Sequence, residues 1–190
     1  MFLRIMSFSA ISFLTGTALA ASESYTIDST HTFPSFEISH VGFSTQRGRF
    51  NGTTGSIMLD RSVKKVAVEI SIDANSIDTG FDKLEEHLRK PDFFDVAKHP
   101  TITFKSSNGR FDGETLVALE GQLTMHGETK PVVLQVNNFK CGNHPFNKKA
   151  LCSADVSGTI KRTDFGMKYG VPFVGDEVKL FIQVEALKGA

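Results

Sequence analysis

The chain has 190 residues, with 21 basic and 21 acidic side chains and no long run of one sign. This balance argues against a nucleic-acid partner, because phosphate binding requires a concentrated basic surface. The length suits one domain with a substantial core better than two domains.

The first 20 residues have the pattern of a secretory signal peptide. Arg4 precedes an apolar run from Ile5 to Leu14, and Ala18-Leu19-Ala20 places small residues where a signal peptidase cleaves. We expect cleavage after Ala20 and a mature domain over residues 21–190. The apolar run is too short for a permanent membrane span, so an uncleaved anchor is the less favoured alternative.

Alternation of apolar and polar residues predicts an all-β protein. In the clearest runs, Lys65–Asp73 and Val178–Glu185, every second residue is Val, Ile or Leu. Weaker runs of the same period lie at Tyr25–Ser29, Phe33–Val41, Thr54–Asp60, Thr101–Ser106, Thr115–Met125, Pro131–Phe139 and Ala154–Ile160. The sequence therefore predicts eight or nine strands.

Turn residues separate these runs. Asn51-Gly52, Asn108-Gly109 and Asp112-Gly113 suit tight hairpins, because both residues of each pair tolerate positive φ, and His126-Gly127 separates two further strands. Connections this short imply antiparallel neighbours.

One helix is predicted before Pro91, with Asp78 or Thr79 as its cap. Its apolar face is expected to hold Phe81, Leu84 and Leu88. A second, weaker helical segment is predicted at Val41–Arg47.

Eight or so antiparallel strands with one or two short helices fit a barrel or a sandwich. We favour the barrel, because closure removes exposed strand edges, and its interior can be filled or can hold one elongated ligand.

Cys141 and Cys152 are the only cysteines. In an oxidising compartment we expect them to form a disulfide that closes the loop between two strands. This closure would contribute roughly 3 kcal/mol in the chain-entropy model. A redox-active pair is the less favoured alternative, because the spacing is not Cys-x-x-Cys.

The chain shows no local pattern of a metal or catalytic site. Its six histidines form neither His-x-His nor His-Glu-x-x-His, so we favour structural roles over metal ligation for His40, His87 and His126. No Gly-x-Ser-x-Gly nucleophile motif or phosphate-binding glycine loop occurs.

An ordered series of motifs resembles the YceI-like family of periplasmic lipid-binding proteins. In chain order the motifs are Tyr25–His31, Ile38–Phe43, Arg49–Phe50, Ser76–Gly80, His87–Arg89, Asp92–Asp95, Pro100–Ser106, Gly121–Gly127, Lys130–Val132 and Arg162–Gly166. The chain departs from many relatives at Leu84-Glu85, where they have Arg-Asp, and in its cysteine-bearing loop near 141–152. The resemblance implies a lipocalin-like extended antiparallel barrel in the periplasm, with a polyisoprenoid or similar long-chain amphiphile in its lumen.

The expected site combines apolar walls with polar groups at the barrel mouth. A long isoprenoid chain makes few hydrogen bonds, so its binding must bury apolar surface, whereas a charged head would contact Arg or His donors at the mouth. The predicted ligand-binding residues are Phe36, His40, Phe43, Phe50, Leu84, His87, Arg89, Phe93, Phe94 and Phe104. His40 and Arg89 are the favoured head-group contacts. Phe93 and Phe94 either line the lumen or plug one end of the core.

Three functional classes remain open. The first is a binding or carrier protein for a polyisoprenoid, isoprenoid quinone or fatty-chain lipid, with no required cofactor and no metal. The second is an enzyme acting on such a lipid, and the third is a stress-response or interaction protein with a filled, inert barrel. The family also implies links to membrane cytochrome b-type proteins, and the size of the chain allows a homodimer.

Overall fold

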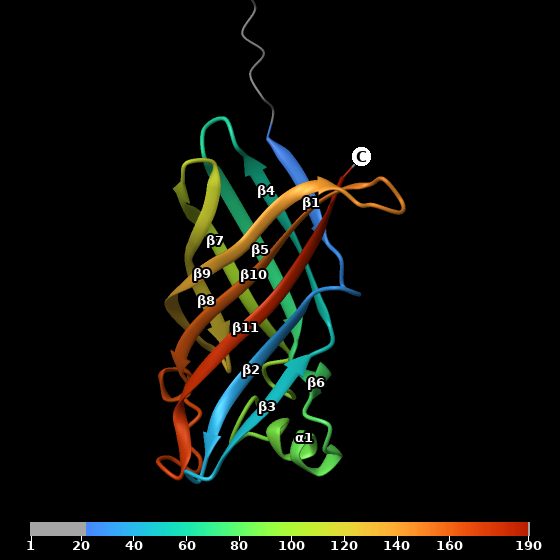
Figure 1. The fold of residues 1–190 in the computed structure, drawn as a ribbon. Coiled ribbons are helices and arrows are strands. Elements are labelled where there is room, and N and C mark those ends of the chain that lie inside the picture. Colours follow the sequence, from blue (N-terminus) through green and yellow to red (C-terminus); the bar gives the residue numbers. More distant parts are fainter. Residues whose placement is uncertain (1–21, 190) are drawn as a thin grey trace, which may run out of the picture.

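The structure, a computed structural model, describes residues 22–189 and consists mainly of β-strands (Figure 1). The strands are β1 (Glu23–Ile27), β2 (Phe33–His40), β3 (Ser44–Phe50), β4 (Thr53–Asp60), β5 (Lys65–Asp73), β6 (Ile77–Asp78), β7 (Thr101–Asp112), β8 (Thr115–Met125), β9 (Glu128–Asn143), β10 (Ala150–Lys161) and β11 (Val174–Lys188). The helices are η1 (Ala74–Ser76), α1 (Asp82–Leu88) and η2 (Arg162–Phe165). The predicted signal peptide lies outside the described residues. Within residues 22–189, no helix has the length and hydrophobicity needed to cross a bilayer.

Eight antiparallel strands form the barrel in the order β1, β4, β5, β7, β8, β9, β10 and β11, and the pairing of β1 with β11 closes the ring. At one end, the sheet continues from β11 through β2 and β3 to β6. Helix α1 lies at this end, the lower end in Figure 1, which we call the α1 end. The predicted lipocalin-like barrel is therefore confirmed.

The closure depends on a change of partner along β11. Its residues Val174–Gln183 pair with β2, and Ala186–Lys188 pair with β1. Between the two, the side chain of Thr32 takes the place of a neighbouring strand. Its Oγ1 donates a hydrogen bond to the carbonyl oxygen of Glu185 (3.1 Å) and accepts one from the amide of the same residue (3.1 Å). The Glu185 carbonyl oxygen also accepts from the Asp28 amide (2.9 Å), so the backbone group that depends on this buried threonine is the Glu185 amide.

The helix predicted at residues 41–47 is wrong. His40 and Ser44 are paired residues of β2 and β3, so Val41, Gly42 and Phe43 form the loop of a hairpin. Val41 and Gly42 have φ values of 47° and 74°. This left-handed backbone conformation turns the chain back on itself instead of continuing a helix.

Two of the predicted turns are also wrong. Asn51-Gly52 does not join paired strands, since β3 pairs with β2 and β6 while β4 pairs with β1 and β5. Instead, the Asn51 amide donates to Ser76 O, and Gly52 O accepts from the Asp73 amide. Asn108-Gly109 lies inside β7, next to a bulge that follows Ser106.

The turns at Asp112-Gly113 and His126-Gly127 are confirmed. Positive φ occurs at Gly113 (58°) and at both His126 (53°) and Gly127 (80°). These turns join β7 to β8 and β8 to β9 as antiparallel neighbours.

Helix α1 is confirmed, but its predicted caps are wrong. Phe81 occupies the N-cap position without a side-chain hydrogen bond, and Asp78 accepts instead from the Gly80 amide (3.0 Å). Leu88 packs against the core, whereas the Phe81 side chain is exposed. The predicted apolar face is therefore only partly buried.

The predicted disulfide is present. Cys141 and Cys152 face each other across β9 and β10 and are bonded. The bond therefore joins paired strands and closes the loop between them, which is the structural role that the sequence favours.

Arg162 organises the loop at the α1 end that joins η2 to β11. Its side chain is buried and donates to the backbone carbonyls of Met167, Tyr169, Val174 and Gly175 at distances of 2.8–3.1 Å. Burial lowers the pKa of Arg162, although a guanidinium stays protonated. Arg162 forms no ion pair among the described residues, and the Asp176 carboxylate accepts hydrogen bonds from Thr163.

Replacing Arg162 by lysine should destabilise the fold, because an ammonium group cannot reach four carbonyls at once. We expect Arg162→Lys to lower the free energy of unfolding in urea by about 3 kcal/mol. Arg110→Lys, at an exposed position of β7, is the matched control and should change it by less than about 0.5 kcal/mol. Equal stability of the two variants would contradict this role for Arg162.

The turn between β1 and β2 contains a coupled pair of titrating groups. His31 Nδ1 lies 3.0 Å from Asp28 Oδ2. Hydrogen bonds from Thr30 and His31 lower the pKa of Asp28 to about 2, and the bond to Asp28 raises the pKa of His31 above 6.5. The stabilisation from His31 is therefore complete below pH 6.5 and is lost as the pH rises through its folded pKa. The stabilisation from Asp28 is complete above its ordinary pKa of 3.8 and is lost as the pH falls towards 2.

An NMR titration should show this coupling. We expect His31 to titrate with a midpoint above 6.5 in the native protein and closer to 6.5 in Asp28→Asn, because the substitution removes the carboxylate. Asp60→Asn, in another turn, should leave the His31 midpoint unchanged. A native midpoint at or below 6.5 would refute the coupling.

Candidate functional site

An elongated cavity fills the barrel lumen. Inward-facing side chains of all eight barrel strands line it, together with residues of β2 and β3, and its volume is about 170 Å³. On β8 alone the lining extends from Leu116 to Met125, which corresponds to roughly 30 Å of strand. The space is therefore long and narrow, as a hydrocarbon chain requires.

The lumen stays open partly because large side chains lie over inward-facing glycines. A Cβ atom at Gly121 would come within 2.6 Å of the Phe104 ring, and one at Gly158 within 2.8 Å of Leu134. The Phe104 ring therefore occupies space that a side chain at residue 121 would need. This arrangement keeps the ring close to the wall and leaves the axis of the barrel open.

The lumen is apolar over its whole length. Of the residues that the structure describes, no Asp, Glu, Lys, Arg or His lines the cavity. Hydroxyl groups are contributed by Thr32, Thr53, Ser35, Ser153 and Tyr25. Such a lining favours an uncharged, largely apolar occupant.

Thr53 lines the lumen with a buried hydroxyl group that has no hydrogen-bond partner among the described residues. Its side chain is 1% exposed, and its Oγ1 has no hydrogen-bond partner among residues 22–189. A buried hydroxyl without a partner costs about 1–3 kcal/mol. Because Oγ1 has almost no accessible surface, an occupant of the otherwise apolar lumen could bond to this hydroxyl only after the Thr53 side chain rotates.

Tyr25 lines the lumen at the end opposite to α1. Its hydroxyl donates to Glu23 Oε2 at 2.6 Å. Burial, together with the bond to Glu23, raises the pKa of Tyr25 to about 12. The phenol thus stays protonated and keeps its donor directed at Glu23, away from a lumen ligand.

The predicted aromatic site is partly assembled. Phe36, Phe50 and Phe104 line the lumen. Phe94 does not, but its ring packs edge-on against Phe50 with 5.4 Å between centroids, and it contacts the core cluster. This placement favours Phe94 as a plug of the α1 end.

The remaining six predicted contacts lie outside the lumen lining: His40, Phe43, Leu84, His87, Arg89 and Phe93. Phe43 is 93% exposed and His40 is also exposed, both at the hairpin between β2 and β3. His87 and Phe93 instead form an aromatic cluster with Tyr169, with ring centroids 5.0–5.6 Å apart. Their contact with a ligand stays a prediction.

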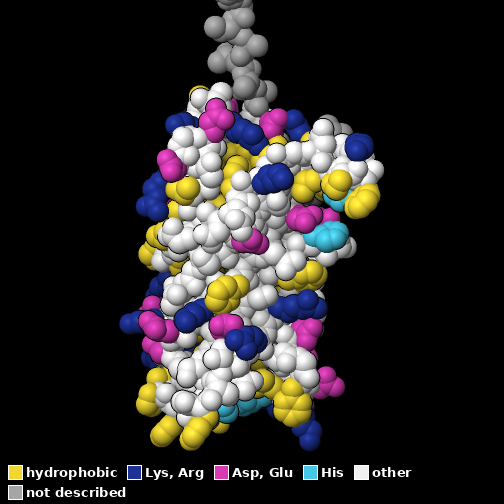
Figure 2. Space-filling view, in the orientation of Figure 1, with side chains coloured by type: hydrophobic (Ala, Val, Ile, Leu, Met, Phe, Trp, Pro, Cys, Tyr) yellow, Lys and Arg dark blue, Asp and Glu magenta, His cyan; other side chains and the backbone are white. Residues whose placement is uncertain are grey.

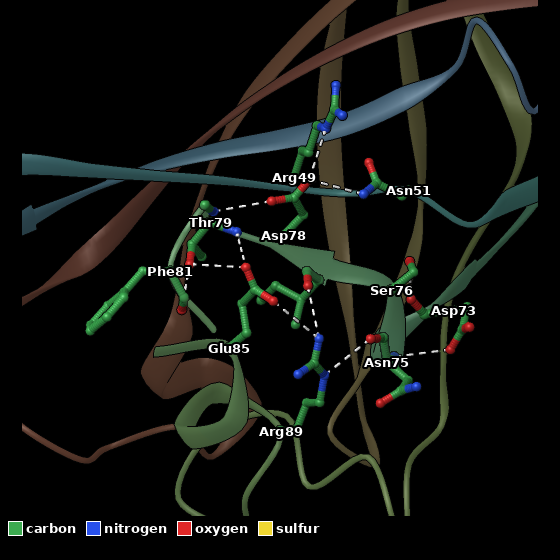
Figure 3. Close-up of polar contacts among 12 residues, drawn as sticks. Arg49, Asn51, Asp73, Asn75, Ser76, Asp78, Thr79, Phe81, Glu85 and Arg89 are labelled. Carbon is green, nitrogen blue, oxygen red and sulfur yellow. Dashed lines mark hydrogen bonds and ion pairs between the residues drawn. The ribbon is translucent and has the colours of Figure 1, made fainter. Parts of the chain in front are cut away.

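Arg89 has a structural role at the α1 end (Figure 3). Its Nε and Nη2 donate to the carbonyl oxygens of Asn75 and Ile77, both at 3.1 Å, and Nη2 also lies 3.4 Å from Glu85. Glu85 in turn accepts a hydrogen bond from the Thr79 amide at 2.9 Å. These contacts tie α1 to η1 and β6, so the guanidinium is largely occupied by the fold itself.

Among residues 22–189, histidines and acids also meet outside the lumen. His126 Nδ1 lies 2.9 Å from the Phe165 carbonyl oxygen, so one of its ring nitrogens has a partner in the fold. Asp28, His31 and Glu185 bring ligand atoms within 4.8 Å of one another on the outside of the barrel. The bond between Asp28 and His31 accounts for that proximity without an ion.

Most residues of the lumen lining are not among the predicted contacts, although the alternation of apolar and polar residues indicates them. The inward positions of β5, such as Val66 and Val68, and those of β11 follow directly from the period of two. Thr53 was missed because the predicted strand began at Thr54. Thr53 therefore lies one residue before the start of the predicted strand.

Comparisons with known proteins agree with this fold. The YceI-like domain family matches residues 25–186. A UPF0312 protein of Pseudomonas paraeruginosa is 34% identical over 177 residues, covering 93% of this chain and 92% of that protein. Burkholderia cenocepacia BcnA has a TM-score of 0.73 at 22% identity, covering 84% of this chain and 98% of its own. A polyisoprenoid-binding domain from Saccharophagus degradans has a TM-score of 0.66 at 19% identity, covering 88% and 99%.

Proposed function

The chain belongs to the YceI-like domain family, and we propose that it binds a polyisoprenoid or similar long-chain lipid inside its barrel. The observation that carries this proposal is the elongated lumen with its uncharged lining. A hydrocarbon chain that enters it gains roughly 25 cal/mol for each Å² of apolar surface removed from water. The polyisoprenoid-binding domain of similar fold supports the same ligand class.

We further propose that the protein stores or carries this lipid across the periplasm. The predicted signal peptide and the disulfide both support an oxidising compartment outside the cytoplasm. A closed barrel shields a chain that water would otherwise force into a membrane or an aggregate. The proposed links to a membrane cytochrome b-type protein and to a homodimer rest on the resemblance and on chain size alone.

The lining also supports an uncharged head for any part of the lipid that enters the lumen. A diphosphate without a cationic partner would be costly in this apolar environment. The free hydroxyl of Thr53 instead suits one neutral oxygen, such as that of a quinone, an alcohol or an ester. A charged head would remain outside the barrel.

Binding is better supported than the two alternative functions. Catalysis in the lumen would need a general acid, base or nucleophile, and the described lining offers neither histidine nor carboxylate. An inert barrel would need a filled interior, whereas this one holds a cavity of about 170 Å³.

Native mass spectrometry of the periplasmically expressed protein should reveal a stoichiometric lipid adduct. Ala154→Phe adds a ring to the lumen wall and should reduce the fraction that carries lipid, because it fills the cavity. Ala67→Phe adds the same ring on the outer face of β5 and is the matched control. Solvent extraction would then identify the lipid.

A protein that stays free of adduct after incubation with isoprenoid and fatty lipids would contradict lumen binding. Equal adduct in the two phenylalanine variants would place the lipid elsewhere on the molecule. Thermal stability of both variants, measured in parallel, separates a blocked lumen from a damaged fold.

Thr53→Val tests the polar contact, because it removes the hydroxyl at nearly constant volume. We expect roughly threefold to tenfold weaker binding of a prenyl alcohol or prenyl quinone, and no weaker binding of a pure prenyl hydrocarbon. Thr54→Val, at the adjacent exposed position, should bind both as the native protein does. An equal loss for hydrocarbon and alcohol would refute a hydrogen bond from Thr53.

A further inference from the structure

Exposed apolar side chains gather at the α1 end of the barrel. Figure 2 shows hydrophobic groups projecting from the lower end of the molecule. Five of them come from two loops and are defined here as the ring patch: Val41, Phe43, Tyr169, Val171 and Phe173, with exposed fractions of 44%, 93%, 54%, 37% and 74%. Two phenylalanines as exposed as these leave large apolar areas in contact with water.

The two loops form one continuous and well-anchored surface. The Val41 amide donates to the Phe173 carbonyl oxygen at 2.7 Å, and Val174 pairs with His40. The Tyr169 ring packs against His87, and the Tyr169 carbonyl accepts from buried Arg162. The rings therefore project from fixed backbone, so their exposure is a feature of the folded state.

The two loops of the ring patch carry positive charge and no negative charge. In residues 41–43 and 166–174, Lys168 is the only charged side chain. Exposed carboxylates at this end lie on α1 and after it, at Asp82, Glu86 and Asp92, and on the elements that flank the second loop, at Asp164 and Glu177. A convex set of aromatic rings beside a lysine, with no acid in the same loops, fits the interfacial region of an anionic bilayer. Aromatic rings are also common in protein interfaces, so contact with a second copy of the chain is the alternative that the test below must distinguish.

The patch also adjoins the end cover of the lumen. Phe165 lies directly before the loop that carries Tyr169, Val171 and Phe173, and Met167 lies within that loop. Both are buried in the same hydrophobic cluster as the lumen residues Met125 and Ile160. A membrane contact at the patch would therefore place the bilayer next to the side chains that cover this end of the cavity.

We propose that the ring patch docks onto the surface of a lipid bilayer, with Phe43 and Phe173 inserted among the lipid head groups and upper acyl chains. Lipid exchange at this end is a further consequence that rests on the proposed function. The docking itself does not, because it concerns the outer surface of the barrel. An experiment can therefore refute lipid binding in the lumen without refuting membrane docking, and the reverse also holds.

Cosedimentation with vesicles tests the docking. The full chain, expressed and processed in the periplasm, is mixed with vesicles of phosphatidylcholine, with or without phosphatidylglycerol. We expect the double variant Phe43→Ser, Phe173→Ser to bind both kinds of vesicle about tenfold more weakly, because two inserting rings are lost. Lys168→Glu should weaken binding only to vesicles that contain phosphatidylglycerol.

Phe146→Ser is the matched control, because Phe146 is 89% exposed in the loop between β9 and β10, far from the α1 end (Figure 1). It should bind vesicles as the native protein does. An equal loss in this variant would mean that any exposed ring promotes binding and would overturn the proposal. Ala154→Phe should also bind vesicles normally, which separates docking from occupation of the lumen.

Two further results would overturn the proposal. One is the absence of vesicle binding by the native protein. The other is concentration-dependent dimerisation, measured by light scattering, that the double variant abolishes while vesicle binding is unchanged. That second result would assign the ring patch to contact between two copies of the chain.

Discussion

The whole structure depends on closing one hydrogen-bonded ring of strands, and this closure converges on β11. One edge of β11 pairs with β10, from Glu177 to Leu187, while the other edge must serve β2 and then β1. The carbonyl oxygen of Glu185 keeps a partner at this change, the Asp28 amide, but the Glu185 amide would lose its hydrogen bond without Thr32. The hydroxyl of Thr32 bridges this point. Because the ring is closed there, alternate residues of the eight barrel strands face one common lumen.

That lumen is hollow because of how its wall is packed. A barrel of about eight strands has an interior that side chains can fill. Here the Phe104 ring lies over Gly121 and the Leu134 side chain lies over Gly158, so bulk is placed near the wall. Two arginines at the α1 end donate to backbone carbonyls. Arg89 bonds to η1 and β6, and Arg162 bonds to the loop before β11. The unpaired hydroxyl of Thr53 is therefore unusual in this protein, and sites where local rules are broken tend to be functional.

Much of the fold follows from the sequence, because strands of a barrel have one apolar and one polar face. The runs at Lys65–Asp73 and Val178–Glu185 correctly predicted β5 and most of β11, together with their inward residues. The errors at Val41–Arg47 and Asn51-Gly52 have a common cause. Local turn preference does not show which strands will pair, and pairing across the sheet decided both segments.

The candidate site was harder to predict for the same reason. An arginine at residue 89 beside the predicted mouth suits a lipid head group, but its donors meet carbonyls 12 and 14 residues earlier in the chain. Those contacts depend on where α1 docks, which no local pattern contains. The lumen contact of Phe36 was predictable from alternation, whereas the exposure of Phe43 depended on a hairpin that the sequence did not predict.

The closed ring also limits how a long chain can reach the lumen. Separating two strands breaks a row of hydrogen bonds, each worth about 1 kcal/mol net, in addition to the packing behind them. At the α1 end, Phe94, Phe165 and Met167 pack in or against the core, and none of them belongs to a strand. Displacing these side chains would not break strand pairing. Exchange through an end of the barrel is therefore less costly than exchange through its wall. Arg162 contributes to both features of the α1 end, because it belongs to the η2 segment that covers the lumen and bonds to the loop that presents Tyr169 and Phe173.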